Sequence, residues 1–341
     1  KIQILSTAHL CPGLARLRKR SGKPCVRMSI YLNEIRASER MAHLAGKMAR
    51  TARYFRHLFR HTEGRSLHEV PMFTQEKKTA LVTGASSGMG KAIARRLIED
   101  GYQVYAAARS IEKMADLARL GAQPLRMDIS VDAERVFAVN TILAQTGGVD
   151  VLVNNAGFGL YGPVEEIGID EARYQFEVNL FGAARLTQLL LPAMRARGAG
   201  HIVNITSMGG KMYSVLGAWY HATKHALEGW SDCLRLEVAE FGIKVVIVEP
   251  GVIETGFGDA ASDSIVKRSA SGPYGRLVKM VAMSIKNTYG QGKGSSPELI
   301  ADVVSRAVKS RNPGTRYAAG KFAKLLIRMR VWLGDRIFDR I

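Results

Sequence analysis

The sequence predicts a doubly wound α/β domain, in which a parallel sheet carries helices on both faces. From Thr79 onward, short and almost wholly apolar runs alternate with longer helical patterns, and a glycine-rich turn directly follows the first run. Strands without polar positions are buried on both faces, as in a parallel sheet covered by helices. A glycine turn between such a strand and a helix is typical of nucleotide-binding folds.

The elements follow one another in strict alternation. The apolar runs predicted as strands lie at 79–83, 103–108, 124–128, 149–154, 201–206 and 244–250. The helical stretches between them are predicted at 89–100, 111–120, 131–146, 170–197 and 220–241. This alternation predicts parallel strands joined by crossover helices. Because the sequence contains neither an internal repeat nor the pattern of a second globular domain, residues 76–341 are predicted to form a single domain.

Residues 1–75 differ in character and are predicted to be a basic N-terminal extension that is poorly ordered or not native. Residues 1–71 carry +11 of the chain's net charge of +19. Within them, residues 47–61 can form an amphipathic helix with arginines beside an apolar stripe. Four interpretations stay open: a transit peptide, a membrane-surface helix, an unstructured extension, or upstream sequence translated ahead of a start near Met72.

Composition excludes several classes of protein. The chain has three unclustered cysteines, Cys11, Cys25 and Cys233, so neither a disulfide framework nor a metal site is expected. The expected location is therefore a reducing one, the cytoplasm. No apolar run reaches the roughly 18 residues that a membrane span needs. Because no nucleic-acid motif accompanies the basic excess, no nucleic-acid partner is expected, whereas peripheral membrane contact stays open.

The stretch ALVTGASSGMGKAIARRL, residues 80–97, joins the first strand to the first helix through a glycine turn. Glycine allows a tight turn, close approach of the backbone to a pyrophosphate, and close packing of helix on strand. Serine hydroxyls and the free N–H groups of the helix start favour an anion there. The cofactor contacts expected from this turn are Gly84, Ser86, Ser87, Gly88, Met89 and Gly90. The G-x-x-x-G-x-G spacing departs from the common G-x-G-x-x-G fingerprint, and a purely structural turn is the alternative.

The end of the second strand indicates which dinucleotide binds. An NAD-binding strand in this place carries a carboxylate for the adenosine ribose. This strand ends without an acid and is followed by Arg109, whose guanidinium suits a 2′-phosphate. NADP(H) is therefore favoured and NAD(H) stays open, with a solvated loop arginine as the alternative interpretation.

Tyr220 and Lys224 stand four residues apart in a predicted helix, which places both side chains on one face. Such pairs are common on helix surfaces, but the context favours function. The preceding strand leads directly to Ser207, and ligands bind at the carboxyl ends of strands in such sheets. Ser207 can hydrogen-bond a substrate oxygen and stabilise charge developing on it; a turn residue is the alternative.

A lysine beside a tyrosine has a calculable electrostatic effect. The tyrosine pKa is about 10, and bringing it to about 7 requires roughly 4 kcal/mol. An ammonium at about 5 Å supplies about 3 kcal/mol at an effective dielectric of about 20. A cationic nicotinamide ring could supply the rest. We therefore expect Lys224 to lower the pKa of the Tyr220 phenol into the range of acid–base catalysis.

The motifs together resemble those of the short-chain dehydrogenases/reductases of the compact, single-domain kind. The resemblance rests on the glycine turn, NNAG at 154–157, Asn179, Ser207, the pair Tyr220 and Lys224, and EPGVIET at 249–255. It extends over about 77–320. It implies a Rossmann-like sheet of seven parallel strands, and homodimers or homotetramers joined through the helices predicted at 170–197 and 220–241.

The resemblance also implies catalytic roles. Tyr220 would be the general acid or base, Ser207 would orient the substrate oxygen, and Asn179 would support a water that relays protons. Lys224 would lower the tyrosine pKa and hold the nicotinamide ribose. Taken alone, Asn179 in mid-helix is unusual enough to favour a functional role.

Further cofactor contacts are implied in three segments. They are Asp128 and Ile129 at the adenine, Asn155, Ala156 and Gly157 along the cofactor, and Pro250, Gly251, Ile253 and Thr255 at the nicotinamide. Taken alone, Asp128 is equally a strand-end cap and NNAG an ordinary turn. Many NADP(H)-using members carry a basic residue just before the middle glycine, where this chain has Ser87, so the NADP preference depends on Arg109.

The substrate is expected between the loop 208–219 and the segment after Thr255. Residues of about 255–290 resemble the mobile lid that these enzymes close over substrate. The side chains that predict an apolar pocket, or else belong to the core, are Met212, Tyr213, Val215, Leu216 and Trp219. The amphipathic, basic tail 320–341 is predicted to be a helix that touches an anionic membrane or packs beside the pocket. It resembles tails of the steroid- and retinol-dehydrogenase-like branch, which implies a hydrophobic alcohol or ketone.

The sequence thus predicts an NADP(H)-preferring oxidoreductase that moves hydride between the nicotinamide and a secondary alcohol or carbonyl compound, without a metal. One rival is a cofactor-binding regulator on the same fold, without turnover. The four catalytic side chains argue against it, because sensing needs the glycine turn but not Tyr220. A second rival is a nucleic-acid-binding or membrane-surface protein driven by the basic excess, whose binding would weaken steeply with salt.

Overall fold

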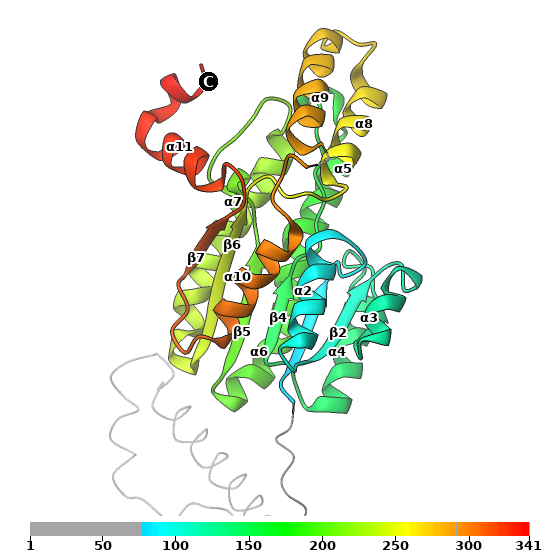
Figure 1. Cartoon of the computed structure of the whole chain (residues 1–341), viewed down its shortest axis with the longest axis vertical. Helices are drawn as coiled ribbons and strands as arrows, with labels where there is room; N and C mark the ends of the chain where they lie inside the picture. The colour runs from blue at the N-terminus through cyan, green and yellow to red at the C-terminus, as the bar shows by residue number, and fades with distance from the viewer. Residues whose placement is uncertain (1–76, 291, 341) are drawn as a thin grey trace, which may run out of the picture. The chain divides into compact units, whose positions relative to one another are not determined.

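Figure 1 shows the computed structural model of the chain, which describes residues 77–290 and 292–340. The extension 1–75, with its predicted helix at 47–61, lies outside the described residues. No helix among those described combines the length and the apolar character that crossing a bilayer requires.

The described residues contain a seven-stranded parallel sheet in the order β3-β2-β1-β4-β5-β6-β7. The strands are β1 Thr79–Thr83, β2 Gln103–Ala108, β3 Gln123–Arg126, β4 Val151–Asn154, β5 Gly200–Ile205, β6 Ile243–Pro250 and β7 Arg316–Ala319. The order reverses between β1 and β4, because the chain builds outward to β3 and then returns to the other side of β1. Ligands of such sheets bind at this switch point, beyond the carboxyl ends of the strands.

Helices cover both faces of the sheet (Figure 1). They are α2 Gly88–Glu99, α3 Ala115–Arg119, α4 Asp132–Thr146, α5 Ile169–Phe176, α6 Gly182–Arg197, α7 Ala218–Val238, α8 Phe257–Ser269, α9 Gly275–Tyr289, α10 Pro297–Lys309 and α11 Ala323–Phe338. The single helix predicted at 170–197 is wrong in one respect. A π-helical turn, Glu177–Phe181, separates α5 from α6. The segment predicted as a lid contains α8 and α9.

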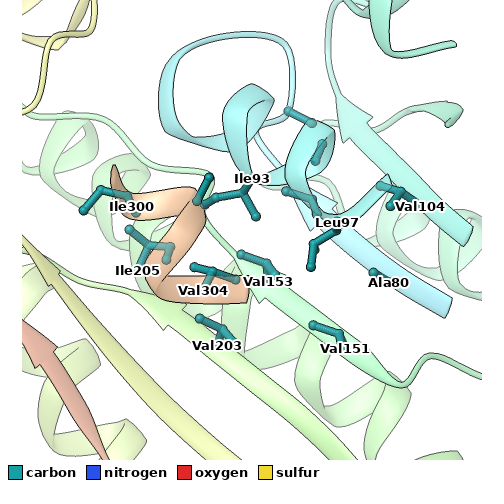
Figure 2. Packing of buried hydrophobic residues seen from close by; sticks show 14 of the residues in the cluster. Ala80, Ile93, Leu97, Val104, Val151, Val153, Val203, Ile205, Ile300 and Val304 are labelled. Carbon is teal, nitrogen blue, oxygen red and sulfur yellow. The ribbon is translucent and has the colours of Figure 1, made fainter. Parts of the chain in front are cut away.

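Two buried clusters hold the layers together and account for the apolar strands. On one face α2 and α10 pack against the sheet; Figure 2 labels Ala80, Ile93, Leu97, Val104, Val151, Val153, Val203, Ile205, Ile300 and Val304 of this cluster. On the other face Ile142 of α4, Leu186 of α6 and Leu234 of α7 belong to a second cluster. Burial of each side chain of this size stabilises the folded state by about 1.5–3 kcal/mol. The predicted doubly wound fold is confirmed.

Candidate active site

The glycine turn lies between β1 and α2, at the switch point of the sheet. Gly84 and Gly88 have φ angles of 67° and 51°, in the left-handed region that favours glycine. Gly90 has ordinary helical geometry, but a Cβ there would overlap the carbonyl oxygen of Gly84. The turn is thus closed on itself by backbone contact. Within the described residues the exposed Ser87 makes no capping hydrogen bond with its side chain, which leaves its hydroxyl at the start of α2 for a ligand.

Thr83 and Asn155 join the end of β1 to the loop after β4. The Thr83 Oγ1 accepts hydrogen bonds from the backbone N–H groups of Asn155 and Ala156, both at 3.0 Å. The Asn155 Nδ2 in turn donates to the Thr83 carbonyl at 2.9 Å. Asn155 therefore stabilises the glycine turn through hydrogen bonds within the protein. The sequence analysis missed Thr83, although a threonine that ends an apolar strand directly before a glycine turn is a usable signal.

Arg109 and Asp128 lie near each other where β2 and β3 end. The Arg109 side chain is exposed. Burial raises the pKa of Asp128, but hydrogen bonds from Ser130 and the charge of Arg109 outweigh it and hold this pKa below its usual value. The Asp128 carboxylate accepts from the Ser130 N–H and hydroxyl at 2.9 and 2.7 Å, so it caps the turn before α4. Ile129 is buried in the core.

The segment after β6 faces the glycine turn. A Cβ on Gly88 would come within 3.0 Å of the Thr255 Cγ2, which places Thr255 directly beside the turn. Gly251 donates its N–H to the Ala319 carbonyl at 2.8 Å, and Ile253 is 3% exposed. This segment, with Pro250 at the end of β6, therefore closes the switch point opposite α2.

Tyr220, Lys224 and Ser207 meet beyond the carboxyl ends of the central strands. Tyr220 and Lys224 are 8% and 6% exposed, and the Lys224 Nζ donates to the Ile205 carbonyl at 3.0 Å. The Ser207 Oγ accepts from the Gly209 N–H at 3.0 Å, so its own proton can be donated to a ligand. A Cβ on Gly157 would lie 3.7 Å from the Lys224 Nζ, which places the NNAG loop against the ammonium.

The expected effect of Lys224 on the Tyr220 pKa is not found in the protein alone. Burial raises the pKa of the Tyr220 phenol, against a smaller lowering by Ser207. Burial also lowers the pKa of Lys224 to about 8, partly offset by the charge of Glu228. The physical reason is that both groups are removed from water, while the ammonium is directed at the Ile205 carbonyl. Desolvation therefore exceeds the attraction that the spacing alone suggested.

Asn179 lies at the centre of the π-helical turn and is 2% exposed. Its Oδ1 accepts from the Phe158 N–H at 3.0 Å, while its Nδ2 donates to the Phe158 carbonyl at 2.9 Å and to the Thr223 hydroxyl at 3.1 Å. The side chain thus fixes the loop after β4 to the start of α7. Single π-turns in helices are frequent at functional sites.

Aromatic and histidine side chains that the sequence analysis did not single out surround Tyr220. The rings of Tyr161 and Phe257 each lie with their centroids 5.5 Å from the Tyr220 ring. His221 accepts at Nε2 from the Ser214 N–H at 3.1 Å, so its Nδ1 carries the proton and donates to the Gly209 carbonyl at 2.9 Å. His221 therefore ties α7 to the loop after β5. The position of His221 next to Tyr220 in the sequence could have indicated a place in the site, whereas no sequence feature indicated one for Tyr161.

A cavity of about 580 Å³ opens beside this group. Its lining comes from the loop after β4, the loop after β5, the start of α7 and the N-cap of α9: Gly162, Pro163, Val164, Glu165, Tyr213, Ser214, Leu216, Ala218, His221 and Tyr274. Leu216 has a φ of 64°, an uncommon value for a branched side chain, so this loop is strained at the cavity wall. Of the other predicted pocket residues, Met212 is buried, Trp219 is half-buried and Val215 is 56% exposed.

The helices α8 and α9 pack over the cavity side of the domain. Arg268 of α8 donates two hydrogen bonds of 2.7 Å to the Glu171 carboxylate of α5. Paired bonds between a guanidinium and a carboxylate fix orientation as well as distance. This pair fixes the lid segment to α5, in addition to the apolar packing of α8 and α9 against Tyr161 and Tyr220.

A buried group of charges lies behind Lys224, one turn further along α7. Glu228, 2% exposed, accepts from the Thr206 hydroxyl at 2.6 Å and pairs with Lys211 and Arg316, both at 3.1 Å. Glu249 lies 3.6 Å from Arg316, and burial, aided by Glu228, raises its pKa to about 7. Among the described residues no group of three or more His, Cys, Asp or Glu side chains is arranged to hold a metal ion.

Comparison with known families decides the identity. The family described as short chain dehydrogenase matches residues 78–265. The chain belongs to this family. Its members are oxidoreductases that act on alcohol and carbonyl groups, and the seven-stranded parallel sheet is that of the family.

Similar short-chain dehydrogenases are known as proteins and as structures. A 3-ketodihydrosphingosine reductase of Bacteroides thetaiotaomicron is 34% identical over 76% of this chain and 94% of its own length. The 17-beta-hydroxysteroid dehydrogenase type 1 of Homo sapiens is 32% identical over 75% of this chain and 81% of its own.

Among solved structures, a short-chain dehydrogenase from Streptomyces avermitilis superposes with a TM-score of 0.65 at 35% identity, covering 76% of this chain and 93% of that chain. An actinorhodin polyketide ketoreductase variant solved with NADPH superposes with a TM-score of 0.61 at 34% identity, covering 72% and 96%.

Proposed function

We propose that this short-chain dehydrogenase is an NADP(H)-preferring oxidoreductase that transfers hydride between the nicotinamide and a secondary alcohol or carbonyl compound. The observation that carries the proposal is that Tyr220, Ser207 and Lys224 lie together beyond the carboxyl end of β5, at the same edge of the sheet as the glycine turn. A non-catalytic regulator would need the turn but would have no use for a buried tyrosine next to a buried lysine.

The proton transfer is assigned to Tyr220. In reduction, the Tyr220 hydroxyl donates its proton to the substrate oxygen, which also accepts a hydrogen bond from Ser207. A nicotinamide held at its ribose by Lys224 would supply the hydride in this direction and would accept it in the other. In oxidation, Tyr220 takes the proton of the alcohol. Because burial raises the pKa of the phenol, its ionised form needs the cationic charge of Lys224 together with that of an oxidised nicotinamide.

The remaining cofactor contacts are assigned by position. Lys224 would hold the nicotinamide ribose, and the loop of Asn155, Ala156 and Gly157 would line the cofactor between that ribose and the turn. Thr255 would close on it from the side opposite α2. A relay water beside Asn179 stays a prediction.

The cofactor preference follows from Arg109. Its guanidinium is exposed where β2 ends, no acid occupies the carboxyl end of that strand, and its charge reaches Asp128. A planar guanidinium can bind a 2′-phosphate with two parallel hydrogen bonds. The similar ketoreductase solved with NADPH agrees with this preference.

The substrate is proposed to be a hydrophobic alcohol or ketone. Val164, Leu216 and two tyrosine rings give the cavity wall its apolar surface, and a small set of polar side chains can orient a ligand there: Glu165, Ser214 and His221. The similarity to a ketodihydrosphingosine reductase and to a hydroxysteroid dehydrogenase supports a large apolar substrate.

Homo-oligomers and a cytoplasmic location complete the proposal. Leu236 of α7 and Phe181 of the π-helical turn are 74% and 53% exposed, on the helices expected to join subunits. Light scattering during size-exclusion chromatography would give the number of chains.

The test compares Tyr220→Phe with the parent chain in a panel of apolar ketones reduced with NADPH. Removing the hydroxyl should lower kcat by about 10²–10⁴-fold, because it removes general acid catalysis. NADPH binding, followed by cofactor fluorescence, should stay unchanged. Tyr174→Phe is the matched control, since Tyr174 is 43% exposed and outside the site. Full turnover by Tyr220→Phe would remove the assigned mechanism.

A further inference from the structure

Two helices near the substrate cavity expose basic and apolar side chains together. α9 and α11 lie at the end of the domain where the strands end (Figure 1). Neither residues 275–289 nor 321–334 contain an aspartate or a glutamate. Acid-free stretches of this length are unusual for a solvated helix, whose surface normally mixes both signs of charge.

The outer face of α11 carries large apolar side chains that are mostly exposed. Leu325, Val331 and Trp332 are 55%, 66% and 78% exposed. Exposed Lys324 and Arg328 lie at helical spacing among them, so basic and apolar side chains share one face. Ala323, at 0% exposure, packs on the domain at the start of α11, and Phe338, at 9% exposure, packs on it beyond a kink in this helix at Gly334. The packing alternative from the sequence therefore applies to these residues, and the membrane alternative stays open for the outer face.

The outer face of α9 repeats this arrangement. Met280 and Met283 are 57% and 66% exposed. Exposed Arg276 and Lys279 stand four residues before Met280 and Met283 respectively, on the same face. Two separate elements thus present one surface chemistry.

We propose that the outer faces of α11 and α9 bind the surface of an anionic lipid bilayer. An amphipathic helix lies in the interface with its apolar side chains below the headgroups and its lysines and arginines against anionic lipids. Tryptophan is favoured at that depth. A second copy of this chain is the poorer occupant, because two such faces, each with exposed lysine and arginine, would bring like charges together.

This surface adjoins the cavity through Tyr213. Tyr213 lines the cavity, donates from Oη to the Asp339 carboxylate at 2.7 Å, and meets the Phe338 ring edge to face with ring centroids 5.3 Å apart. Arg330 of α11 lies over the same ring at 5.0 Å. An apolar substrate could therefore enter the cavity from the bilayer, a consequence that rests on the proposed function, whereas lipid binding does not.

The test uses the full chain and sedimentation with vesicles of phosphatidylcholine, with and without phosphatidylserine. The parent should bind the anionic vesicles, and less at high salt. The double variant Leu325→Glu with Trp332→Glu should bind them at least about tenfold more weakly, because it places two carboxylates in the interface. Phe137→Glu, at a 68% exposed position of α4, is the control and should bind like the parent.

Insertion is measured separately with vesicles of brominated lipid, which quench tryptophan at the depth of the acyl chains. Quenching in the parent that disappears in Trp332→Phe would place α11 in the interface. Equal binding by parent and double variant, without quenching at Trp332, would overturn the proposal and assign any affinity to another segment, such as 1–75. A dimer that the double variant loses in lipid-free solution would also overturn it, in favour of a second copy. None of these readouts requires turnover.

Discussion

The glycine turn after β1 and the start of α7 contribute to the same site, but different interactions build them. The turn depends on space: Gly84 and Gly88 have positive φ, and Gly90 leaves no room for a Cβ. The start of α7 depends on burial, since Tyr220 and Lys224 are removed from water and paired with few groups. Changes at the turn should therefore alter cofactor affinity, and changes on α7 should alter turnover.

The largest departure is expected from Lys224→Met, which keeps the length of the side chain and removes its charge. Turnover should fall by at least about 100-fold, because the phenol loses the cation that favours its ionised form. NADPH affinity should fall much less. An equal loss of both would erase the distinction between the two regions.

The same variant has a signature in stability. Burial lowers the pKa of Lys224 from 10.5 to about 8, so the unfolded chain binds more proton between these values. The parent's free energy of unfolding should therefore gain from this group as pH rises from about 8, and Lys224→Met should lack that gain. Denaturant unfolding at several pH values measures the difference. Identical pH profiles would mean that Lys224 is solvated.

Gly90→Ala should act on the other region. Its Cβ would overlap the Gly84 carbonyl and displace the turn, at a cost of about 1–3 kcal/mol, with at least about tenfold weaker NADPH binding. Gly229→Ala is the matched control, since a Cβ there meets nothing within 4 Å and should stabilise α7 by about 0.5–1 kcal/mol. Unchanged cofactor affinity in Gly90→Ala would show that the turn does not hold the dinucleotide.

Arg109→Asp should sharpen the comparison within the cofactor region. The ratio of kcat/KM for NADPH to that for NADH should fall by about 10–100-fold, the value of a charge-assisted hydrogen bond. Arg119→Asp, an exposed change on α3, should leave the ratio alone. If both variants behave like the parent, Arg109 is a solvated loop residue.

The smallest effect is expected from Glu249→Gln, behind the catalytic end of α7. Burial raises the pKa of Glu249 from 4.5 to about 7, so its contribution to stability is present below 4.5 and lost as pH rises through 7. The free energy of unfolding of the variant, relative to that of the parent, should thus rise by about 1 kcal/mol between pH 5 and pH 8. The charges of Arg316 and Lys211 limit this difference. Exposed Glu99→Gln is the control. A constant difference across pH would contradict the assignment.

Local constraints were predictable from the sequence. The strands predicted at 79–83 and 103–108 are β1 and β2 to the residue, because continuous apolar runs are interrupted at once by polar or glycine residues. The i, i+4 pair on α7 and the glycine turn are local as well. Each depends on residues within one turn or one loop.

Long-range and edge features were not. β7 is a half-buried edge strand of four residues, Arg316–Ala319, and it lacks the apolar run that marks the central strands. Two aromatic neighbours of Tyr220 come from distant segments: Tyr161 from the loop after β4, and Phe257 from the start of α8. The Lys224 ammonium meets the Ile205 carbonyl, a backbone atom that carries no sequence signal. The desolvation of Lys224 therefore could not be predicted from the spacing of the two residues.

The π-helical turn at Glu177–Phe181 has a consequence for how the chain tolerates changes of length. Such a turn holds one residue more than an α-helical turn, so losing one residue there would restore regular helix without rotating α6 against α5. Shortening by one elsewhere in these helices would swing every later side chain by about 100°. Deleting Asn179 should therefore disturb the packing of the core less than its buried position suggests. The deletion would then report mainly on the hydrogen bonds between this amide and the loop at Phe158.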